Sequence, residues 1–383
     1  MTMKKHILAI TLLLSSFFIT AQTTVIDSIM SGGIYRNYRL YIPAIYTGTT
    51  ARPLIINMHG YGSNALQQQP YSNFMPISDT ANFLMVYPNG TFSAGKQFWN
   101  SGLYPTGVDD IGFISHLIDS LKAKYNINLN RVYATGMSNG GFMSHTLACE
   151  LSNRITAIAS VTGSIFTTQY GSYCHPNRPI PVMQVHGTAD PTVPYAGNAS
   201  QNMEPIDTVV KYWVTKNNCN PVASFSNVPN TNTADGCTAE HYTYTGGTSG
   251  SSVELFKIIG GTHSWPGFPY GGIGTNMDIN ASKEIWRFFN KYNLTTLNSI
   301  AEIEKQTAVI SVYPNPANTS LNFSADNLNN PESIEITDIL GKVVLFDNVN
   351  THTVTIEKLQ PGIYFLSVKD GNNNYGKAKF IKE

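Results

Sequence analysis

The feature that most constrains the fold is a series of short, almost continuously apolar runs, each bounded by glycine or proline. Five of them occur before residue 190: PLIINMH (53–59), FLMVYP (83–88), RVYATG (131–136), ITAIASVTG (155–163) and PVMQVHG (181–187). Runs of this length and composition are typical of parallel strands that are buried on both faces. We therefore expect a sheet whose two faces are both covered.

Helical patterns alternate with these strands. In DDIGFISHLIDSLKAKY (109–125), apolar residues recur at helical spacing, and two aspartates stand at the favourable end of the helix dipole. Residues 140–150 and 281–292 also have helical patterns, whereas GIYRNYRLYIP (33–43) alternates with period two and predicts an antiparallel hairpin at the sheet edge. The predicted fold class is α/β, a doubly wound and mostly parallel sheet.

The two ends of the chain differ from this pattern. Residues 1–21 combine two lysines, the apolar run ILAITLLLSSFFIT and a small residue, Ala21, which together are typical of a cleaved signal peptide. The run is short for a membrane span, so we expect export without stable membrane insertion. After the main domain (22–293) we expect a linker (294–309), followed by a small antiparallel β-sandwich (310–383) built from strand and turn signals.

The charge balance argues against two classes of partner. The chain has 24 basic and 24 acidic residues, and charged residues make up only 13% of it. Nucleic-acid-binding proteins and polybasic membrane-surface proteins carry a concentrated positive charge, which is missing here. We expect neither nucleic acid nor a membrane surface as a partner.

Four cysteines, Cys149, Cys174, Cys219 and Cys237, predict disulfides in an exported chain. They form no C-x-x-C pair, which argues against a zinc or thioredoxin-type site. Three pairings are possible. We favour Cys149–Cys174 and Cys219–Cys237, because these pairings close the shortest loops at the smallest entropic cost.

The stretch TGMSNGG (135–141) places Ser138 between Gly136 and Gly140, after a predicted strand and before a predicted helix. This strand–turn–helix context is typical of a G-x-S-x-G nucleophile elbow. The glycines are needed because strand and helix backbones approach too closely for a β-carbon. We predict that Ser138 is a nucleophile at a helix N-terminus, where the dipole favours developing negative charge.

A serine hydroxyl needs a base to remove its proton, and folds with this elbow order their triad as Ser, then Asp or Glu, then His. Asp190, in VHGTADPTVPY, follows a buried strand at the place expected for an orienting carboxylate. Among the later histidines, His352 lies in the sandwich and His241 lies within an alternating run. His263 instead lies in a glycine-flanked loop after the strand VELFKII, so we predict that it is the base.

An oxyanion hole requires two backbone N–H donors. We predict that they come from Asn139, directly after the nucleophile, and from Tyr61 in the loop MHGYGSN. His59 precedes the serine and is expected to shape this loop by hydrogen bonding. The mechanism requires no metal and no cofactor, and the chain has no metal-ligand spacing such as H-E-x-x-H.

Taken in order, the segments HGYGSN, FWN, VDDIGF, GMSNGG, HGTADPTVPY and GGTHSWPG resemble the secreted esterase family that includes polyhydroxybutyrate depolymerases and feruloyl or acetylxylan esterases. The likeness covers about residues 38–289. It implies an α/β-hydrolase fold, the triad roles given above, and Trp99 and Trp265 as aromatic walls of the substrate site; core packing is the alternative for each tryptophan. The implied substrate is an ester, possibly polymeric.

The C-terminal segments YPNP, DILGKVV and LQPGIYFLSV resemble a type A sorting domain of the type IX secretion system. This resemblance implies a Gram-negative source, the type IX machinery as a partner, and passage across the outer membrane. It also implies that the tail is removed.

Two other functions remain open from the sequence. A serine peptidase could use the same triad, and a surface-binding protein could keep the fold without catalysis, although the intact triad argues against the second. Feruloyl or acetyl groups on plant polysaccharide, a short polyester such as polyhydroxybutyrate, and small soluble esters all remain candidate substrates.

Overall fold

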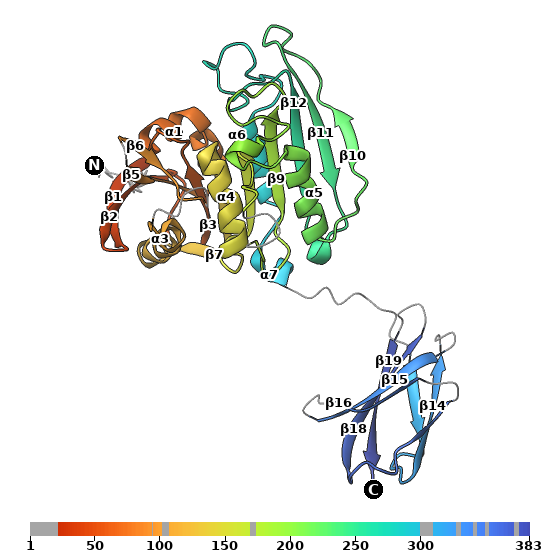
Figure 1. Ribbon diagram of the computed structural model, residues 1–383. Helices are drawn as coiled ribbons and strands as arrows, with labels where there is room; N and C mark the ends of the chain where they lie inside the picture. Colours follow the sequence, from red (N-terminus) through yellow and green to blue (C-terminus); the bar gives the residue numbers. More distant parts are fainter. Residues whose placement is uncertain are drawn as a thin grey trace, which may run out of the picture. The chain divides into compact units, whose positions relative to one another are not determined.

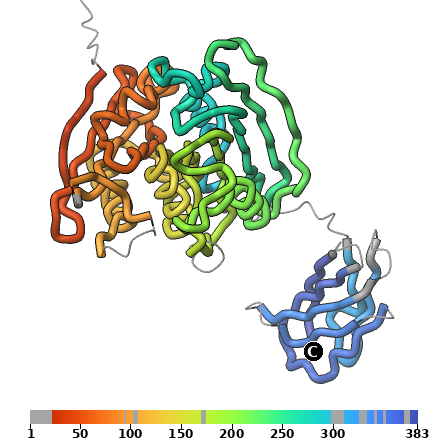
Figure 2. The backbone as a smooth tube through the Cα atoms, turned by 45° about the horizontal axis from the view of Figure 1, so that its top comes forward, coloured from red at the N-terminus to blue at the C-terminus, as the bar shows by residue number. Residues whose placement is uncertain are grey.

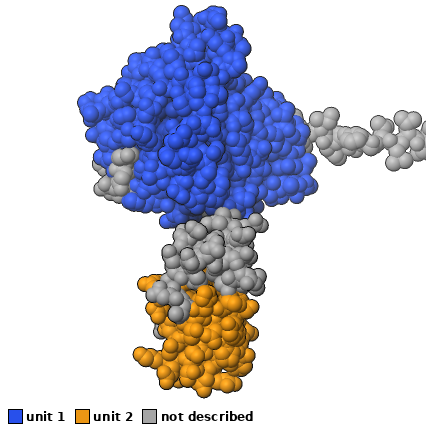
Figure 3. Space-filling view, turned by 90° about the vertical axis from the view of Figure 1, so that its right-hand side faces the viewer, with its two compact units in different colours: residues 1–299 blue, residues 300–383 orange. Residues whose placement is uncertain are grey.

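The structure is a computed structural model that describes residues 22–93, 95–101, 107–168, 174–298, 309–326, 331–339, 343–348, 352–370 and 375–383. The predicted signal peptide lies outside these residues. The chain divides into two compact units, residues 1–299 and 300–383, which Figure 3 colours separately. In the part of the chain that the structure describes, no helix has the length and apolar character needed to cross a membrane.

A ten-stranded sheet forms the first unit, in the order β1-β2-β4-β3-β7-β8-β9-β12-β11-β10. Its strands are β1 Thr23–Ser31, β2 Ile34–Ile42, β3 Arg52–Met58, β4 Leu84–Pro88, β7 Ile127–Met137, β8 Ala157–Val161, β9 Val182–Gly187, β10 Ser224–Asn227, β11 Thr238–Tyr244 and β12 Val253–Ile259. The strands from β4 to β12 along the sheet are parallel, and both edges are antiparallel. The predicted mostly parallel sheet and its edge hairpin β1–β2 are confirmed (Figures 1 and 2).

Helices cover both faces of this sheet. They are α1 Ala65–Ser72, α2 Met75–Ala81, α3 Asp110–Lys124, α4 Asn139–Glu150, α5 Ile206–Lys216, α6 Ala281–Phe289 and α7 Leu294–Asn298, with short 3-10 turns at Ala199–Gln201 and Thr248–Gly250 and a small hairpin of β5 Thr91–Ser93 and β6 Lys96–Phe98. Helices α3, α4 and α5 share one apolar core with the sheet, and α1 and α6 share the other. The sheet is therefore doubly wound, as predicted (Figure 1).

Strand alternation explains how one strand contributes to both cores. In β3, Leu54 and Ile56 belong to the core beneath α3, α4 and α5, whereas Ile55 belongs to the opposite core. All three are fully buried, which explains why the sequence is a continuous apolar run rather than an alternating one. At the start of α3, the Asp109 side chain accepts a hydrogen bond from the backbone N–H of Gly112 at 2.6 Å, as an N-cap should.

The second unit consists of two antiparallel sheets, in the orders β13-β14-β17 and β16-β15-β18-β19. Its strands are β13 Val309–Tyr313, β14 Ser320–Asp326, β15 Pro331–Asp338, β16 Val343–Asn348, β17 Thr353–Thr355, β18 Gly362–Asp370 and β19 Tyr375–Lys382. Side chains from both sheets, including Leu321, Ile336, Leu366 and Phe380, form one buried apolar cluster. A small antiparallel sandwich was predicted, and this prediction is confirmed.

The predicted linker (294–309) was placed too early in the sequence, because the first unit continues past residue 293. Its first five residues form α7, because Leu294 and Leu297 are buried against the first unit. Asn293 caps this turn by accepting a hydrogen bond from the backbone N–H of Thr296 at 2.9 Å. The sequence placed these residues in the linker because five residues are too few to show a helical period.

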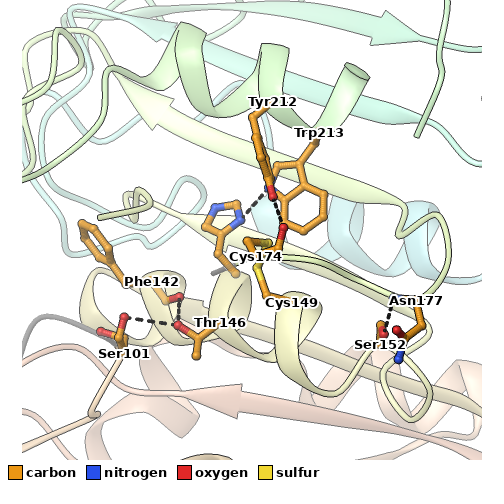
Figure 4. Close-up of a disulfide and its surroundings, with 10 residues drawn as sticks. Ser101, Phe142, Thr146, Cys149, Ser152, Cys174, Asn177, Tyr212 and Trp213 are labelled. Atoms are coloured by element: carbon orange, nitrogen blue, oxygen red, sulfur yellow. Dashed lines mark hydrogen bonds between the residues drawn. A yellow bond between two sulfur atoms is a disulfide. The ribbon is translucent and has the colours of Figure 1, made fainter. Parts of the chain in front are cut away.

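One of the two predicted disulfides is present. Cys149, at the end of α4, bonds to Cys174 with a Cα–Cα distance of 4.7 Å. Figure 4 shows this disulfide beside α5, where the Tyr212 hydroxyl donates to the Cys174 carbonyl at 2.7 Å.

The pairing of Cys219 with Cys237 was wrong, and both are buried free thiols. The residue after Cys219 bonds to Thr245, just beyond the end of β11, whereas Cys237 directly precedes the start of β11. A strand of seven residues separates them by roughly 20 Å, far beyond the reach of a disulfide. Loop length alone could not reveal that an extended strand lies between the two residues.

Candidate active site

Ser138 occupies a tight turn between β7 and α4. Its backbone has φ 54° and ψ −117°, a left-handed conformation that is strained for a residue with a side chain. The Ser138 N–H donates to the Val161 carbonyl at 2.9 Å, which ties the turn to the neighbouring strand β8. The strained backbone matches the predicted nucleophile elbow.

The flanking glycines explain how this turn can exist. A Cβ on Gly140 would lie 2.1 Å from the Met58 carbonyl oxygen, and one on Gly136 would lie 2.6 Å from the same atom. Both distances are impossible for a real side chain. The end of β3 therefore packs directly against the elbow, and only glycine fits at these two positions.

Asp190 lies in the loop after β9, and its carboxylate is fully enclosed. One carboxylate oxygen, Oδ1, accepts hydrogen bonds from the backbone N–H groups of Thr192 at 2.8 Å and Val193 at 2.9 Å. The other oxygen, Oδ2, lies 2.8 Å from His263 Nδ1. Burial raises the pKa of Asp190, but the hydrogen bond and charge of His263, together with the backbone donor of Val193, outweigh burial and hold this pKa below its usual value.

His263 lies in the loop after β12, and its side chain is partly exposed. Because its Nδ1 is engaged with Asp190, Nε2 is the nitrogen that can accept a proton. Ser138, Asp190 and His263 follow β7, β9 and β12, which are parallel strands of one sheet, so all three lie at the same edge. Within the described residues, Ser138 Oγ forms no hydrogen bond.

A buried polar chain continues from the Asp190 loop into the protein, and the sequence analysis did not find it. His186 Nε2 lies 2.8 Å from the Val193 carbonyl and 3.5 Å from Asp190 Oδ2. Its Nδ1 lies 3.1 Å from the Gln184 amide nitrogen, and the Gln184 oxygen lies 3.2 Å from His145 Nε2. His145 Nδ1 is 3.1 Å from Nε1 of Trp213.

Trp213, the last residue of this series of hydrogen-bonded side chains, fixes the direction of every hydrogen bond in the series. An indole N–H can only donate, so His145 Nδ1 accepts and its Nε2 carries the proton. Gln184 then accepts from His145 and donates to His186, whose own Nε2 proton points at the Val193 carbonyl. Burial lowers the pKa of both His145 and His186 to about 4, so both rings are neutral at pH 7.

A cavity of about 350 Å³ opens beside Ser138. Its lining combines the predicted Tyr61, Trp99, Ser138 and Asn139 with the apolar side chains of Phe98, Phe142, Phe166, Val193 and Met203, and with Thr192 and Gln201. The Phe142 and Phe166 rings are stacked with their centroids 4.4 Å apart. The cavity can therefore take an apolar group next to the serine hydroxyl.

The two predicted oxyanion donors both belong to residues that line this cavity. Asn139 is the first residue of α4, where a backbone N–H has no partner within its own helix. Its side chain is held in place by Trp99: Asn139 Oδ1 accepts from the Trp99 N–H at 2.6 Å, and Asn139 Nδ2 donates to the Trp99 carbonyl at 3.0 Å. Gly60, next to Tyr61, lies against Ser138.

The two tryptophans that were predicted to form walls of the substrate site lie in different surroundings. Trp99 lines the cavity, although it is only 1% exposed and its indole N–H donates to the His59 carbonyl at 3.0 Å. Trp265 is also 1% exposed, but it packs in the core against Tyr71 and Phe74, and its indole donates to Ser282. The predicted role of Trp265 as a substrate wall was therefore wrong. Core packing was the correct alternative.

His59 and His241, which were not predicted to be the base, have structural partners. His59 is buried, with Nδ1 2.8 Å from the Gly60 carbonyl and Nε2 accepting from the Gly90 N–H at 3.0 Å, and burial lowers its pKa to about 4. It shapes the loop that carries Tyr61 by hydrogen bonding, as expected. His241 lies within β11 and bonds to Glu254 at 2.8 Å, beside a separate cavity of about 720 Å³ that neither Ser138 nor His263 lines.

Among the residues that the structure describes, no group of three or more His, Cys, Asp or Glu side chains gathers as metal ligands would.

Comparison with known families agrees with this geometry. Residues 108–219, which include the elbow and Asp190, match the phospholipase/carboxylesterase family. Residues 311–383 match the secretion system C-terminal sorting domain, as the sequence predicted.

Two curated relatives match longer stretches of the chain. The chain is 26% identical over 273 residues to a bifunctional acetylxylan esterase/xylanase of Neocallimastix patriciarum, a match that covers 71% of this chain and 35% of that protein. It is 31% identical over 230 residues to feruloyl esterase B of Piromyces equi, covering 58% and 41%. The chain thus spans less than half the length of these two curated relatives.

A solved structure supports the fold. An acetyl xylan esterase from Aspergillus awamori superposes with a TM-score of 0.51 at 14% identity, covering 70% of this chain and 99% of that one. The predicted α/β-hydrolase fold and the predicted relation to feruloyl and acetylxylan esterases are confirmed.

Proposed function

We propose that the first unit is a carboxylic-ester hydrolase in which Ser138, His263 and Asp190 form a catalytic triad. The observation that carries this proposal is the 2.8 Å contact between His263 and the enclosed Asp190 carboxylate, at the same sheet edge as a serine held in a strained elbow. A structural Asp–His pair would not need a strained serine beside an open cavity. The phospholipase/carboxylesterase match supports the same chemistry.

The reaction follows from this arrangement. His263 Nε2 takes the proton of Ser138 Oγ as the oxygen attacks the ester carbonyl carbon, and Asp190 stabilises the resulting imidazolium. The backbone N–H groups of Tyr61 and Asn139 stabilise the negative carbonyl oxygen of the tetrahedral intermediate. His263 then returns its proton to the departing alcohol, leaving an acyl-enzyme. Water, deprotonated by His263, attacks this acyl group, and the carboxylic acid leaves as Ser138 recovers its proton.

The substrates we propose are feruloyl or acetyl esters carried by a polysaccharide, or short polyesters such as polyhydroxybutyrate. The apolar cavity beside Ser138 suits the acyl side of either. The names of the relatives, acetylxylan esterase and feruloyl esterase, favour the polysaccharide esters.

Export completes the proposed function. We infer that residues 311–383 direct the chain through the type IX secretion machinery and are then removed, which places the esterase outside the cell. Mass spectrometry of the protein released into the medium tests this step. The released form should lack both the first 21 residues and the C-terminal unit; a full-length released chain would contradict the removal.

The catalytic proposal is tested with p-nitrophenyl acetate and with a peptide p-nitroanilide on the full chain. We expect turnover of the ester, a loss of at least about 10³-fold in Ser138→Ala, and far slower cleavage of the amide. Ser164→Ala is the matched control, because Ser164 is a buried serine that donates to the Glu204 carbonyl and does not line the cavity. Preference for the amide would identify a peptidase, and hydrolysis that survives Ser138→Ala would exclude the triad.

A further inference from the structure

A second hollow lies close to the cavity at Ser138. It has a volume of about 550 Å³ and is lined by Ser63, Gln67, Pro70, Tyr71, Phe268 and Tyr270, which we call the aromatic groove. Ser63 precedes α1, and Gln67, Pro70 and Tyr71 lie on α1, whereas Phe268 and Tyr270 belong to the same loop as His263. The described lining contains no charged side chain.

One turn of the chain connects the groove to the proposed catalytic serine. The Ser63 N–H donates to the Gly60 carbonyl at 3.1 Å, which closes a β-turn and keeps the two Cα atoms no more than about 7 Å apart. A Cβ on Gly60 would touch the Ser138 Cβ at 3.5 Å. Ser63 is thus at the groove end of a turn whose other end lies against the nucleophile.

The aromatic rings of the groove are arranged for a flat partner. Tyr71 and Phe268 meet edge to face with centroids 4.6 Å apart, and Phe268 and Tyr270 meet edge to face at 5.7 Å. Tyr71 is fixed because its hydroxyl accepts a hydrogen bond from the backbone N–H of Trp265 at 2.9 Å. Tyr270, in contrast, is 86% exposed. A ring left this open beside two packed rings presents an apolar face with a polar tip.

Polar groups at the rim complete the chemistry. The Gln67 oxygen accepts from the Ser63 hydroxyl at 3.0 Å, and within the described residues the Gln67 amide nitrogen has no partner. A pyranose ring presents apolar C–H groups on its face and hydroxyls at its edge. Aromatic faces with amide and hydroxyl groups at the rim match it, and the absence of charged lining residues suits a neutral sugar.

We propose that the aromatic groove is a subsite for a neutral glycosyl unit of the polysaccharide that carries the ester. This inference rests on the proposed function, since it concerns the sugar side of a substrate whose acyl group enters the cavity at Ser138. The groove then lies on the alcohol side of the scissile bond. It selects polysaccharide esters over small esters without touching the reacting atoms.

The test compares two substrates in the full chain: acetylated xylo-oligosaccharide, which has a sugar side, and p-nitrophenyl acetate, which has none. In Tyr270→Ala we expect the ratio of kcat/KM for the oligosaccharide to that for p-nitrophenyl acetate to fall about tenfold, chiefly through KM. Tyr270→Phe keeps the ring and should keep most of the ratio. The matched control is Tyr35→Ala, a 73% exposed tyrosine on β2, which should leave the ratio as in the wild type.

A binding measurement separates the failure of this inference from failure of the proposed function. Migration of the Ser138→Ala protein through a gel containing unacetylated xylan should be retarded, and adding Tyr270→Ala should remove the retardation. This readout needs no catalysis, so it stands even if the wild type hydrolyses neither ester. An unchanged ratio in Tyr270→Ala, an equal loss on both substrates, or free migration of Ser138→Ala would each overturn the subsite. Retardation by a polyester suspension but not by xylan would assign the groove to a polyester instead.

Discussion

Three buried histidines should make the stability of the first unit fall steeply between pH 7.5 and pH 5.0. His59, His145 and His186 are neutral in the folded chain because burial lowers the pKa of each from 6.5 to about 4. In the unfolded chain they bind protons below pH 6.5. Stability is therefore highest above pH 6.5 and is lost as the pH falls from 6.5 toward 4.

The size of the stability loss follows from how far the pH lies below the pKa of the unfolded histidines. At pH 5.0 each unfolded histidine lies 1.5 units below its pKa, and each unit is worth about 1.4 kcal/mol, so each ring lowers the free energy of unfolding by about 2 kcal/mol. Three rings together lower it by about 6 kcal/mol, a large part of the stability of an ordinary domain. Carboxylates with a lowered pKa, such as Asp190, add their own losses only at more acidic pH.

Urea unfolding followed by tryptophan fluorescence is the assay. All four tryptophans, Trp99, Trp213, Trp265 and Trp286, lie in the first unit, so the signal reports this unit within the full chain. The free energy of unfolding should drop by about 6 kcal/mol from pH 7.5 to pH 5.0.

One variant isolates a single ring. In His186→Gln, which keeps a donor near the Val193 carbonyl but cannot titrate, the pH-dependent drop should shrink by about 2 kcal/mol, whatever the variant does to stability at pH 7.5. His175→Gln, at an exposed position, is the matched control. Equal stability at both pH values, or a full drop in His186→Gln, would refute the reasoning.

Three further predictions concern the stability of the first unit. Gly140→Ala would force a Cβ to within 2.1 Å of the Met58 carbonyl oxygen, so we expect a loss of at least about 3 kcal/mol or no folded protein, measured by urea unfolding. Cys149→Ser removes the disulfide and should lower stability by about 3 kcal/mol in the same assay. Trp213→Phe removes the only donor to His145 Nδ1 among the described residues, and should cost about 1–3 kcal/mol by circular dichroism in urea.

Each of these has a matched control. Gly60→Ala should be tolerated, because its Cβ would meet no atom closer than 3.5 Å. Cys219→Ser changes a thiol that forms no disulfide, and Trp286→Phe changes a partly buried indole outside the polar chain. A Gly140→Ala protein as stable as Gly60→Ala would contradict the account of the elbow. If Cys219→Ser lost as much stability as Cys149→Ser, the account of the disulfide would be contradicted. If Trp286→Phe lost as much as Trp213→Phe, the account of the hydrogen bond to His145 would be contradicted.

The sequence was sufficient for features that depend on local pattern. The buried strands β3, β4, β7, β8 and β9 were visible because strands covered on both faces must be apolar throughout. The elbow was visible because Gly136 and Gly140 are required by backbone contact with Met58.

Features that depend on long-range packing were not visible. The polar chain from Asp190 to Trp213 joins residues on β9, α4 and α5, and no local period connects them. The resemblance to the esterase family implied that Trp265 is a site residue, but its side chain packs in the core. Cys219 and Cys237 looked like a pair because sequence separation does not reveal an intervening strand.

Ser138 and His263, the proposed nucleophile and the proposed base, are held with unequal firmness. The elbow at Ser138 is wedged between β3 and β8 in the middle of the sheet, and it cannot shift unless those strands part. His263 lies instead on the segment between β12 and α6, all of which is loop. Loops open at lower free energy than central strands. On heating, we therefore expect the hydrolase activity to be lost at a lower temperature than that at which the first unit unfolds. The His263 imidazole should move away from Ser138 while the sheet that holds Ser138 is still folded.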